Sequence, residues 1–269
     1  MKKNIFFSFF SLLFLFTAQA QTITPRQLLK KVDQSLQDIN SVTYKIDKTN
    51  KFFSSHDTLR RTAMCSLYVD SKDEMNAYHI LDIKYDDDEY GHFKYDGSYT
   101  SSFSYHTDSL DVSQEVSIVN VLEDNHNSIV GTHINNYLLN DFFGSQNPMK
   151  QARSLLAKIF FIKEMTVEES THLGTPVYVL TIYAKNKKSS DYVQNAVNKY
   201  YIRKSDFLPI AYSFYGEFEG MKEYEYFDLE YLSINPDIPL EAFKVDNTKT
   251  VIQPKEVKDI YENVKKYGL

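Results

Sequence analysis

The sequence predicts a mainly β protein with some helix, in which a curved antiparallel sheet forms an unclosed β-barrel, or half-barrel. Runs of alternating apolar and polar residues follow one another with short turns between them, and such alternation places one set of side chains on a buried face. A stretch of helical spacing, residues 128–160, separates the early runs from the late ones. A sheet of about eight or more strands is too wide for its own side chains to fill its concave face. We therefore expect an N-terminal helix and a helical lid to cover that face.

The N-terminal helix is expected over residues 25–39. Thr24 is a good N-cap, and Pro25 suits the first helical position. Helical spacing places five apolar residues on one face, and these are Leu28, Leu29, Val32, Leu36 and Ile39. Polar residues occupy the other positions, so this helix can cover a sheet with one face and meet water with the other.

The early strands are expected at residues 42–46, 62–69, 77–85, 90–95 and 98–105. Asp96-Gly97 stands between the last two of these runs, and an Asp-Gly pair in that position is typical of a β-hairpin. Two helices are expected in the insertion that follows, at residues 128–143 and 149–160, with Gly144 and Pro148 between them.

The late strands are expected at residues 167–169, 177–184, 197–203, 210–218 and 222–232, with turns at Leu173-Gly174 and Glu219-Gly220. In the last of these strands, Tyr224, Tyr226, Leu229 and Tyr231 are expected to carry the apolar load. A charged helix at residues 255–266, with Ile260 and Val264 as a thin apolar stripe, is expected to close the chain.

Residues 1–20 are typical of a secretory signal peptide. Lys2 and Lys3 precede an apolar stretch at residues 5–16, and Ala18-Gln19-Ala20 is a small-x-small cleavage site. A membrane anchor is the alternative, but that stretch is shorter than the roughly 20 residues that a membrane span needs. We expect cleavage after Ala20 and a periplasmic protein. Residues 21–246 then form the half-barrel domain, and residues 247–269 form a C-terminal tail with a short helix.

The charge of the chain argues against nucleic acid as a partner. The formal net charge is −6 at pH 7, and removal of the signal peptide with Lys2 and Lys3 makes it more negative still. An acidic protein repels phosphate backbones. Cys65 is the only cysteine, so an internal disulfide is impossible in a chain that is expected to reach an oxidising compartment.

The sequence contains no arrangement of residues that is typical of an enzyme. The acidic residues at 86–89 lack the ligand spacing of an EF-hand, so a solvated hairpin tip is the better interpretation. The seven histidines have no zinc-ligand spacing, and no Gly-x-Ser-x-Gly motif occurs. Cys65 has apolar neighbours and is expected to be a buried small residue. We therefore expect no catalytic residue, no metal site and no cofactor.

Three segments resemble the lipoprotein-localisation (LolA/LolB-like) family of half-barrels. They are the opening helix at residues 25–39 with the strand at 42–46, the hairpin at 93–99 with its Asp-Gly turn, and the segment at 224–245. The last segment contains Asn235-Pro236-Asp237-Ile238-Pro239 and the closing Phe243. The resemblance covers about residues 24–246. It implies an unclosed antiparallel barrel whose apolar concavity is capped by helices, as in carriers of lipid-modified proteins across the periplasm.

The resemblance and the high aromatic content together predict a binding site in the concavity. Its lining is expected to include Tyr68, Tyr85, Phe93, Phe103, Leu138 and Phe142, with Arg60 and Arg61 at the rim to hold a headgroup or phosphate. The expected partner is a lipid or an acyl-modified protein. Aromatic rings also fill solid cores, so a second hypothesis remains: a non-enzymatic sensing or interaction module with a closed core and an envelope protein as partner.

The helical insertion is expected to act as the lid of this site. Short helices with breakers between them are poorly cooperative on their own, so they can lift from the sheet at modest cost. We expect the lid to shield the empty concavity and to move when a ligand enters.

Overall fold

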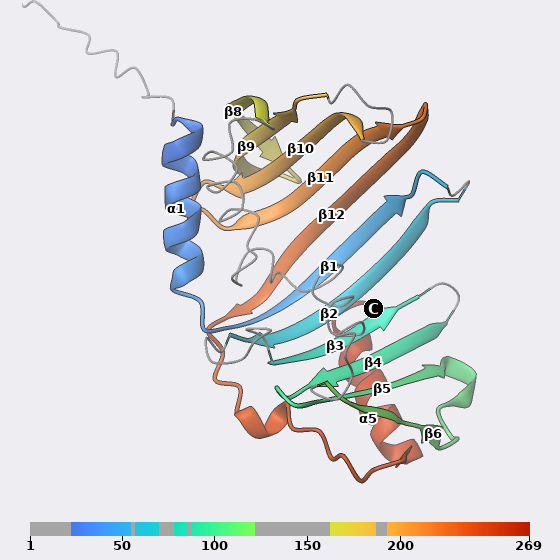
Figure 1. The fold of residues 1–269 in the computed structure, drawn as a ribbon. Helices are drawn as coiled ribbons and strands as arrows, with labels where there is room; N and C mark the ends of the chain where they lie inside the picture. The colour runs from blue at the N-terminus through green and yellow to red at the C-terminus, as the bar shows by residue number, and fades with distance from the viewer. Residues whose placement is uncertain (1–22, 55–56, 70–77, 86–87, 122–161, 187–192) are drawn as a thin grey trace, which may run out of the picture.

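Eleven antiparallel strands form one curved sheet in the computed structural model, which describes residues 23–54, 57–69, 78–85, 88–121, 162–186 and 193–269 (Figure 1). The order of the strands across the sheet is β7-β5-β4-β3-β2-β1-β12-β11-β10-β9-β8. The strands of the early half are β1 Ser41–Lys51, β2 Leu59–Tyr68, β3 Tyr78–Lys84, β4 Glu89–Tyr95, β5 Tyr99–His106, β6 Gln114–Glu115 and β7 Ser117–Asn120. Those of the late half are β8 Ile162–His172, β9 Thr175–Ala184, β10 Gln194–Arg203, β11 Pro209–Phe218, β12 Met221–Ile234 and β13 Val251–Ile252.

Two α-helices and two 3₁₀-helices accompany the sheet among the described residues. They are α1 Pro25–Gln37, η1 Thr107–Ser109, η2 Leu240–Ala242 and α5 Pro254–Lys266. The short strands β6 and β13 pair with each other in a separate two-stranded sheet, which the sequence did not predict. Within the described residues, the edge strands β7 and β8 do not pair with each other, so the barrel is not closed. The predicted half-barrel is therefore confirmed.

The pairing of β1 with β12 joins the early half of the chain to the late half. Ile46 is opposite Leu229 in this antiparallel pair, although the two residues lie near opposite ends of the sequence. Each of the two halves is otherwise built from neighbouring hairpins, because β1 to β5 pair in chain order and so do β8 to β12. The sheet is thus a pair of meanders, and the β1–β12 pair holds them together.

Helix α1 packs against one face of the sheet, which we call the inner face. Thr24 caps the helix in a capping box with Gln27, as Thr and Pro at the start of the helix predict. The five apolar residues predicted for its buried side are all buried, and Leu28 and Val32 are completely so. They form one core with alternate residues of the sheet, among them Ile46 of β1 and Leu229 of β12. Full burial of each such side chain stabilises the fold by about 1.5–3 kcal/mol.

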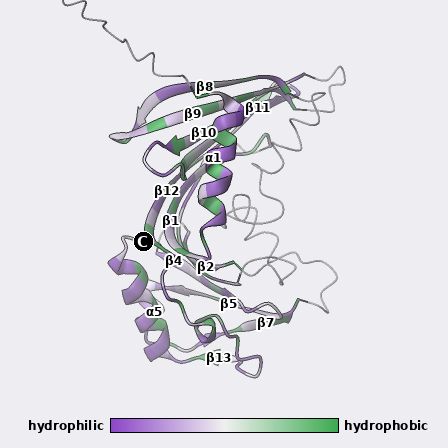
Figure 2. Ribbon diagram, turned by 90° about the vertical axis from the view of Figure 1, so that its left-hand side faces the viewer, coloured by the Kyte–Doolittle hydropathy of each residue, from purple (hydrophilic) through white to green (hydrophobic). Residues whose placement is uncertain are grey.

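Helix α5 packs against the opposite face, which we call the outer face. Val257 and Val264 of this helix are completely buried against Met64 and Phe103. Met64 alternates along β2 with Ala63 and Cys65, which belong to the inner core, so the two helices lie on opposite faces (Figure 2). The C-terminal tail at residues 247–269 is consequently packed onto the half-barrel.

The predicted hairpin turns occur where the sequence places them. Leu173-Gly174 joins β8 to β9, and Glu219-Gly220 joins β11 to β12. Both residues of each turn have positive φ, which is the conformation that matches the twist of an antiparallel hairpin. Glycine at the second position accepts this conformation without strain.

The phase of the alternation in β12 differs from the prediction. Tyr224 and Tyr226 lie on the outer face, whereas Leu229 and Tyr231 alternate with them and pack against the inner core. The ring of Phe227 shares the inner face with Leu229. The error has a simple cause. Tyr226 and Leu229 are separated by an odd number of positions, and such residues point to opposite faces of a regular strand.

Some predictions concern residues outside the described part of the chain. These are the signal peptide at residues 1–20, the two helices at residues 128–160 with Leu138 and Phe142, their role as a lid, and residues 86–87 of the acidic run at 86–89. In the part that is described, no helix combines the length and the apolar character that a membrane crossing requires.

Candidate functional site

A single row of side chains crosses the inner face of the sheet, and we call it the cross-strand row. Each member lies opposite the next on the neighbouring strand, from β9 through β10, β11, β12 and β1 to β2. The row continues to Tyr85, just after β3, because the guanidinium carbon of Arg61 lies over the Tyr85 ring, 5.4 Å from its centroid. The members in order are Leu180, Tyr200, Tyr212, Phe227, Lys48, Arg61 and Tyr85.

The middle of the cross-strand row is a continuous series of aromatic rings. The ring centroids of Tyr200 and Tyr212 are 5.1 Å apart, and those of Tyr212 and Phe227 are 5.2 Å apart. These separations are typical of favourable tilted ring contacts. Tyr212 donates a hydrogen bond of 2.8 Å from its hydroxyl to Oδ1 of Asn198, which fixes its polar end. Tyr200 is buried, whereas Tyr212 and Phe227 are half-buried and form an apolar floor.

The row changes character where β12 meets β1. Lys48 is opposite Phe227, and its side chain is only 7% exposed. A buried ammonium group is costly unless it has a partner, and here Nζ lies 2.7 Å from Oε1 of Glu225. Arg61 is opposite Lys48 on the next strand, so two cationic side chains are neighbours on the inner face.

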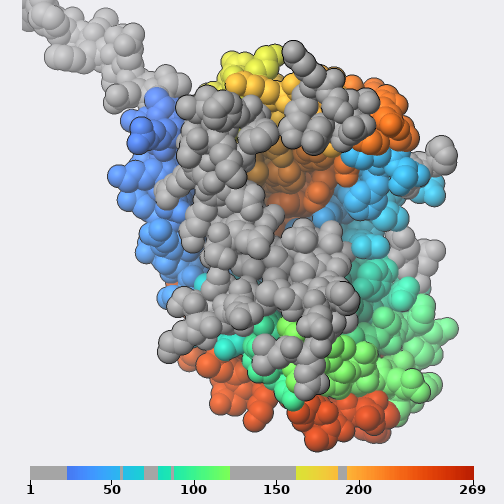
Figure 3. Space-filling view, viewed as in Figure 1, coloured from blue at the N-terminus to red at the C-terminus, as the bar shows by residue number. Residues whose placement is uncertain are grey.

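The inner face is hollowed over part of the late strands. In the space-filling view, the atoms of β11 and β12 lie deeper than those of the strands on either side of them (Figure 3). The hollow and the half-buried rings together define the candidate site: an apolar floor that ends at a pair of cations.

The structure divides the predicted site residues between the two faces. Tyr85, Phe93 and Arg61 lie on the inner face, where Tyr85 and Phe93 pack against the α1 core. Arg60 alternates with Arg61 and is exposed on the outer face. The remaining two described members of the predicted lining, Tyr68 and Phe103, require a separate account.

Tyr68 and Phe103 lie on the outer face, away from the concavity. Tyr68 is stacked on Tyr78, with centroids 6.1 Å apart, and lies 6.4 Å from Phe243 of the closing segment. Phe103 belongs to the core under α5. In each strand, the residues next to Tyr68 and Phe103 point to the inner face. Because side chains alternate along a strand, Tyr68 and Phe103 themselves point to the outer face. They are packing residues, and the expectation that they line the concavity with Tyr85 and Phe93 does not hold for them.

Sequence reasoning missed Lys48, Tyr212 and Phe227. The alternation within each strand marks Tyr212 and Phe227 as apolar positions, but a lysine in a strand reads as a solvent-facing residue. The signal that could have found Lys48 is its even spacing from Ile46 and Tyr44, which places it on the buried face.

A second hollow, of about 460 Å³, lies on the outer side where the β8–β9 turn approaches β12. Nε2 of His172 lies 2.6 Å from Oδ1 of Asp228, and the Tyr226 hydroxyl donates to the same carboxylate oxygen at 2.8 Å. Burial, together with the bond to Asp228, raises the pKa of Tyr226. The lining consists of Asp47, His172, Leu173, Thr175, Arg203, Ile210, Asp228, Leu229, Glu230 and Tyr231.

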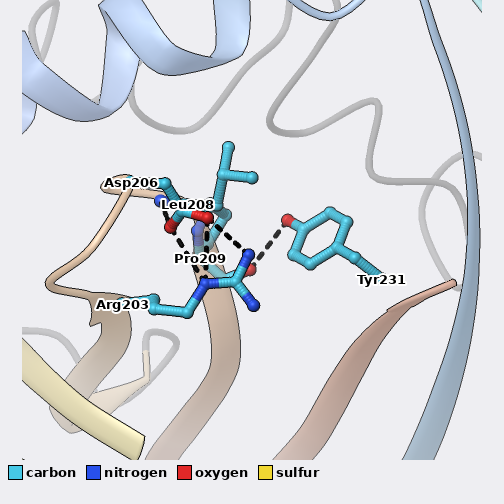
Figure 4. A network of polar contacts seen from close by, with 5 residues as sticks. All are labelled: Arg203, Asp206, Leu208, Pro209 and Tyr231. Atoms are coloured by element: carbon cyan, nitrogen blue, oxygen red, sulfur yellow. Dashed lines mark hydrogen bonds and ion pairs between the residues drawn. The ribbon is translucent and has the colours of Figure 1, made fainter. Parts of the chain in front are cut away.

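A polar network beside this hollow fixes the turn between β10 and β11 (Figure 4). The guanidinium of Arg203 donates to both carboxylate oxygens of Asp206, from Nε at 2.9 and 3.0 Å and from Nη2 at 2.6 Å. The Asp206 bond raises the pKa of Arg203. The backbone N–H of Leu208 donates to Asp206 at 3.2 Å, and the Tyr231 hydroxyl donates to the Pro209 carbonyl at 2.8 Å. These groups hold one another in place, so the network accounts for the local structure without a ligand.

Among the described residues, neither hollow brings together the side chains of a metal site. The described residues include no group of three His, Cys, Asp or Glu side chains arranged to hold a metal ion. Burial raises the pKa of the Cys65 thiol to about 12, so the thiol stays protonated and unreactive at neutral pH. This agrees with the prediction that Cys65 is a buried small residue.

No protein-family model and no curated protein matches the sequence. Solved structures that are similar to the chain include a DUF1329 family protein from Desulfovibrio piger, at 12% identity, covering 83% of this chain and 97% of that one, with a TM-score of 0.34. MucB is similar at 11% identity over 84% of this chain, which spans 64% of the MucB chain, with a TM-score of 0.39. The LolA superfamily protein NE2245 from Nitrosomonas europaea is similar at 9% identity, covering 83% and 99% of the two chains, with a TM-score of 0.24. The chain itself has an unclosed half-barrel fold, and its function is argued below from its own residues.

Proposed function

We propose that this chain is an exported periplasmic binding protein, not an enzyme, which holds an acyl chain of a lipid or of a lipid-modified protein over the inner face of its sheet. The observation that carries the proposal is the aromatic part of the cross-strand row, where Tyr200, Tyr212 and Phe227 form a continuous apolar floor across three strands. Apolar surface of this kind binds an alkyl chain without any reactive group, so the function requires no catalytic residue and no cofactor.

The energetics of acyl binding suit such a floor. Burial of each methylene group is worth about 0.8 kcal/mol, so a chain of some 14 methylene groups gains on the order of 10 kcal/mol before the costs of ordering it. An acyl chain that lies across β10, β11 and β12 meets the ring faces in succession.

Export is part of the proposal. The signal peptide would be removed after Ala20, and the mature chain would then carry Cys65 as its only thiol. Because Cys65 is completely buried, it is kept from forming disulfides with other proteins in an oxidising compartment.

The test is lipid binding by the mature protein. Native mass spectrometry of protein purified gently from the envelope fraction is expected to show a lipid adduct, and delipidated protein is expected to take up a fluorescent fatty acid. Phe227→Ala is expected to weaken this uptake, because it removes a ring from the floor. Tyr183→Ala is the matched control, since Tyr183 is an exposed ring on the outer face of the same sheet.

Two results would contradict the proposal. The first is delipidated protein that takes up no fatty acid while its circular dichroism remains that of a folded β protein. The second is equal loss of uptake in Phe227→Ala and Tyr183→Ala, which would place the bound probe somewhere other than the aromatic floor. A folded protein that binds no lipid and is recovered with an envelope protein would instead support the sensing or interaction module with a closed core.

A further inference from the structure

We propose that Asn198 is a hydrogen-bond donor of the inner-face site, and that the ligand is therefore an acyl ester or amide whose carbonyl oxygen accepts from its side-chain amide. This inference rests on the proposed function and specifies its ligand. The acyl carbonyl lies at Asn198 on β10, and the hydrocarbon tail runs from there over the rings of Tyr212 and Phe227.

The first step of the argument is the position of Asn198 beside the aromatic floor. Asn198 precedes Tyr200 by two positions on β10, so both side chains point to the inner face. Its direct neighbours on the adjoining strands are Ile182 of β9 and Phe214 of β11. Ile182 is buried in the α1 core, whereas Asn198 and Phe214 are half-buried. A polar amide therefore lies among apolar side chains at the β10 end of the floor.

The second step is the hydrogen bonding of this amide. The Tyr212 hydroxyl donates to Oδ1 of Asn198 at 2.8 Å, so the acceptor side of the carboxamide already has a partner. An asparagine side chain also has two N–H donors, both on Nδ2. Among the residues that the structure describes, Nδ2 of Asn198 donates no hydrogen bond. The site thus contains a held amide whose two donors are open to a ligand.

The third step is the kind of ligand that such donors favour. A hydrocarbon tail on its own would exclude water from the two N–H groups and leave them without an acceptor, which is costly. A carbonyl oxygen attached to the same tail accepts the hydrogen bond and removes that cost. Esters and amides of fatty acids carry this oxygen at the head of the chain, whereas an ether-linked alkyl chain lacks it.

The fourth step is the direction of the tail. Towards β9 the floor ends at Leu180 and Ile182, which are buried in the α1 core. Towards β12 the half-buried rings of Tyr212 and Phe227 follow, with centroids 5.2 Å apart. A chain whose carbonyl lies at Asn198 therefore finds its apolar contacts in the direction of β12.

A second amide on the inner face provides a matched control. Asn50 of β1 is two positions from Lys48 and lies opposite Glu225 of β12. Glu225 is opposite Phe214, and Phe214 is opposite Asn198, so the two amides lie on the strands β1 and β10 with β12 and β11 between them. Asn50→Leu consequently makes the same chemical change as Asn198→Leu at the other end of the floor.

The experiment compares two ligands that share a tail and differ in the carbonyl oxygen. Binding of methyl palmitate and of methyl hexadecyl ether to delipidated mature protein is measured by displacement of a fluorescent fatty acid. The wild-type protein is expected to bind the ester about fivefold more tightly, as one additional hydrogen bond would give. The ratio of the two affinities is then compared between wild type and variants, which removes the difference in water solubility between the ligands.

The variants locate the carbonyl contact. Asn198→Leu is expected to lower the ester-to-ether ratio about fivefold and to keep ether binding, whereas Asn50→Leu is expected to leave the ratio unchanged. Tyr212→Phe keeps the ring and removes the hydroxyl that holds Oδ1, so Tyr212 as a positioning residue predicts a partial fall, of about twofold. Should Asn198→Leu fail to fold, Asn198→Asp retains the shape without the N–H donors and is expected to lose the same preference.

Two further ligands distinguish the source of the acyl group. Dipalmitoyl phosphatidylethanolamine represents a membrane lipid, and a synthetic peptide with a dipalmitoylglyceryl cysteine represents a lipid-modified protein. Both carry acyl esters, and the one whose affinity falls more in Asn198→Leu identifies the source. If neither affinity falls, the carbonyl contact at Asn198 is refuted.

The outcomes separate this inference from the proposed function. If the ester-to-ether ratio is the same in wild type and Asn198→Leu, or falls equally in Asn50→Leu, the role of Asn198 is wrong while acyl binding stands. If neither ligand nor the fluorescent fatty acid binds to the folded wild type, both proposals fail together.

Discussion

The two faces of β12 serve different purposes, although they are built from alternate residues of one strand. On the inner face, Phe227 and Leu229 are apolar and adjoin the pair of cations on β1 and β2. On the outer face, Tyr226 and Asp228 engage His172 of β8 in a hydrogen-bonded group. The inner face offers apolar surface under a hollow, whereas the outer face uses its polar groups on one another. The comparison teaches that the candidate site is found on the face where half-buried aromatic rings form a continuous apolar surface.

The largest effect is expected where α1 joins the inner face. Leu28→Ala should lower the free energy of unfolding by about 2–5 kcal/mol, because it leaves a cavity in a completely buried position. Urea denaturation followed by circular dichroism measures this change. Lys30→Ala, on the exposed side of the same helix, should change it by less than about 0.5 kcal/mol. A loss below about 1 kcal/mol in Leu28→Ala would mean that α1 is not part of the core.

A smaller loss is expected where α5 joins the outer face. Val264→Ala should cost about 2 kcal/mol, since valine loses fewer buried atoms than leucine does. Lys265→Ala is the control on the exposed side of α5. The same denaturation experiment applies, and equal costs for the two substitutions would show that α5 does not pack on the sheet.

The hydrogen-bonded group of His172, Tyr226 and Asp228 on the outer face is expected to matter for stability and not for ligand binding. Asp228→Asn removes the charge that faces both His172 and Tyr226, and it should cost about 1–2 kcal/mol of unfolding free energy. Uptake of a fluorescent fatty acid by the folded variant should equal that of the wild type. Reduced uptake at unchanged stability would show that ligand binding also depends on the outer face.

The smallest effect at neutral pH concerns Cys65 in the inner core. Burial raises the pKa of its thiol to about 12, above the ordinary value of 9.0, so the folded state holds this proton more tightly than the unfolded state does. The contribution of this thiol to the free energy of unfolding is therefore fully present below about pH 9. Between pH 9 and 12 the free energy of unfolding falls by at most about 1.4 kcal/mol per pH unit. Denaturation of wild type and Cys65→Ala at pH 7 and pH 10.5 measures the difference. A decline of the same size in both proteins would assign it to other groups.

The sequence predicts most elements of the fold because each depends on local patterns. Thr24 and Pro25 mark the start of α1, and paired residues such as Leu173-Gly174 mark the turns. The cross-strand row could not be predicted in this way. Its members Lys48 and Phe227 come from distant segments, and their contact depends on the register of β1 against β12. Alternation shows which residues of a strand share a face, but neither the neighbouring strand nor its register.

The faces of single residues were the second difficulty. Tyr68 and Phe103 are aromatic like Tyr85 and Phe93, so the resemblance and the aromatic content together predicted one lining for all four. The structure divides them because each strand has its own phase, which is fixed by what packs on it: α1 on one side and α5 on the other. Arg60 and Arg61 illustrate the same point at adjacent positions.

The pairing of β1 with β12 also governs how the protein acquires its fold. The first strand of the sheet finds its second neighbour only in the last long strand of the chain, so the contact has a very large separation in sequence. Contacts of this kind require a long loop to close and make folding slow. Until β12 has emerged, β1 presents an unpaired edge that can associate with other chains. The two meanders are thus joined late, when β12 pairs with β1.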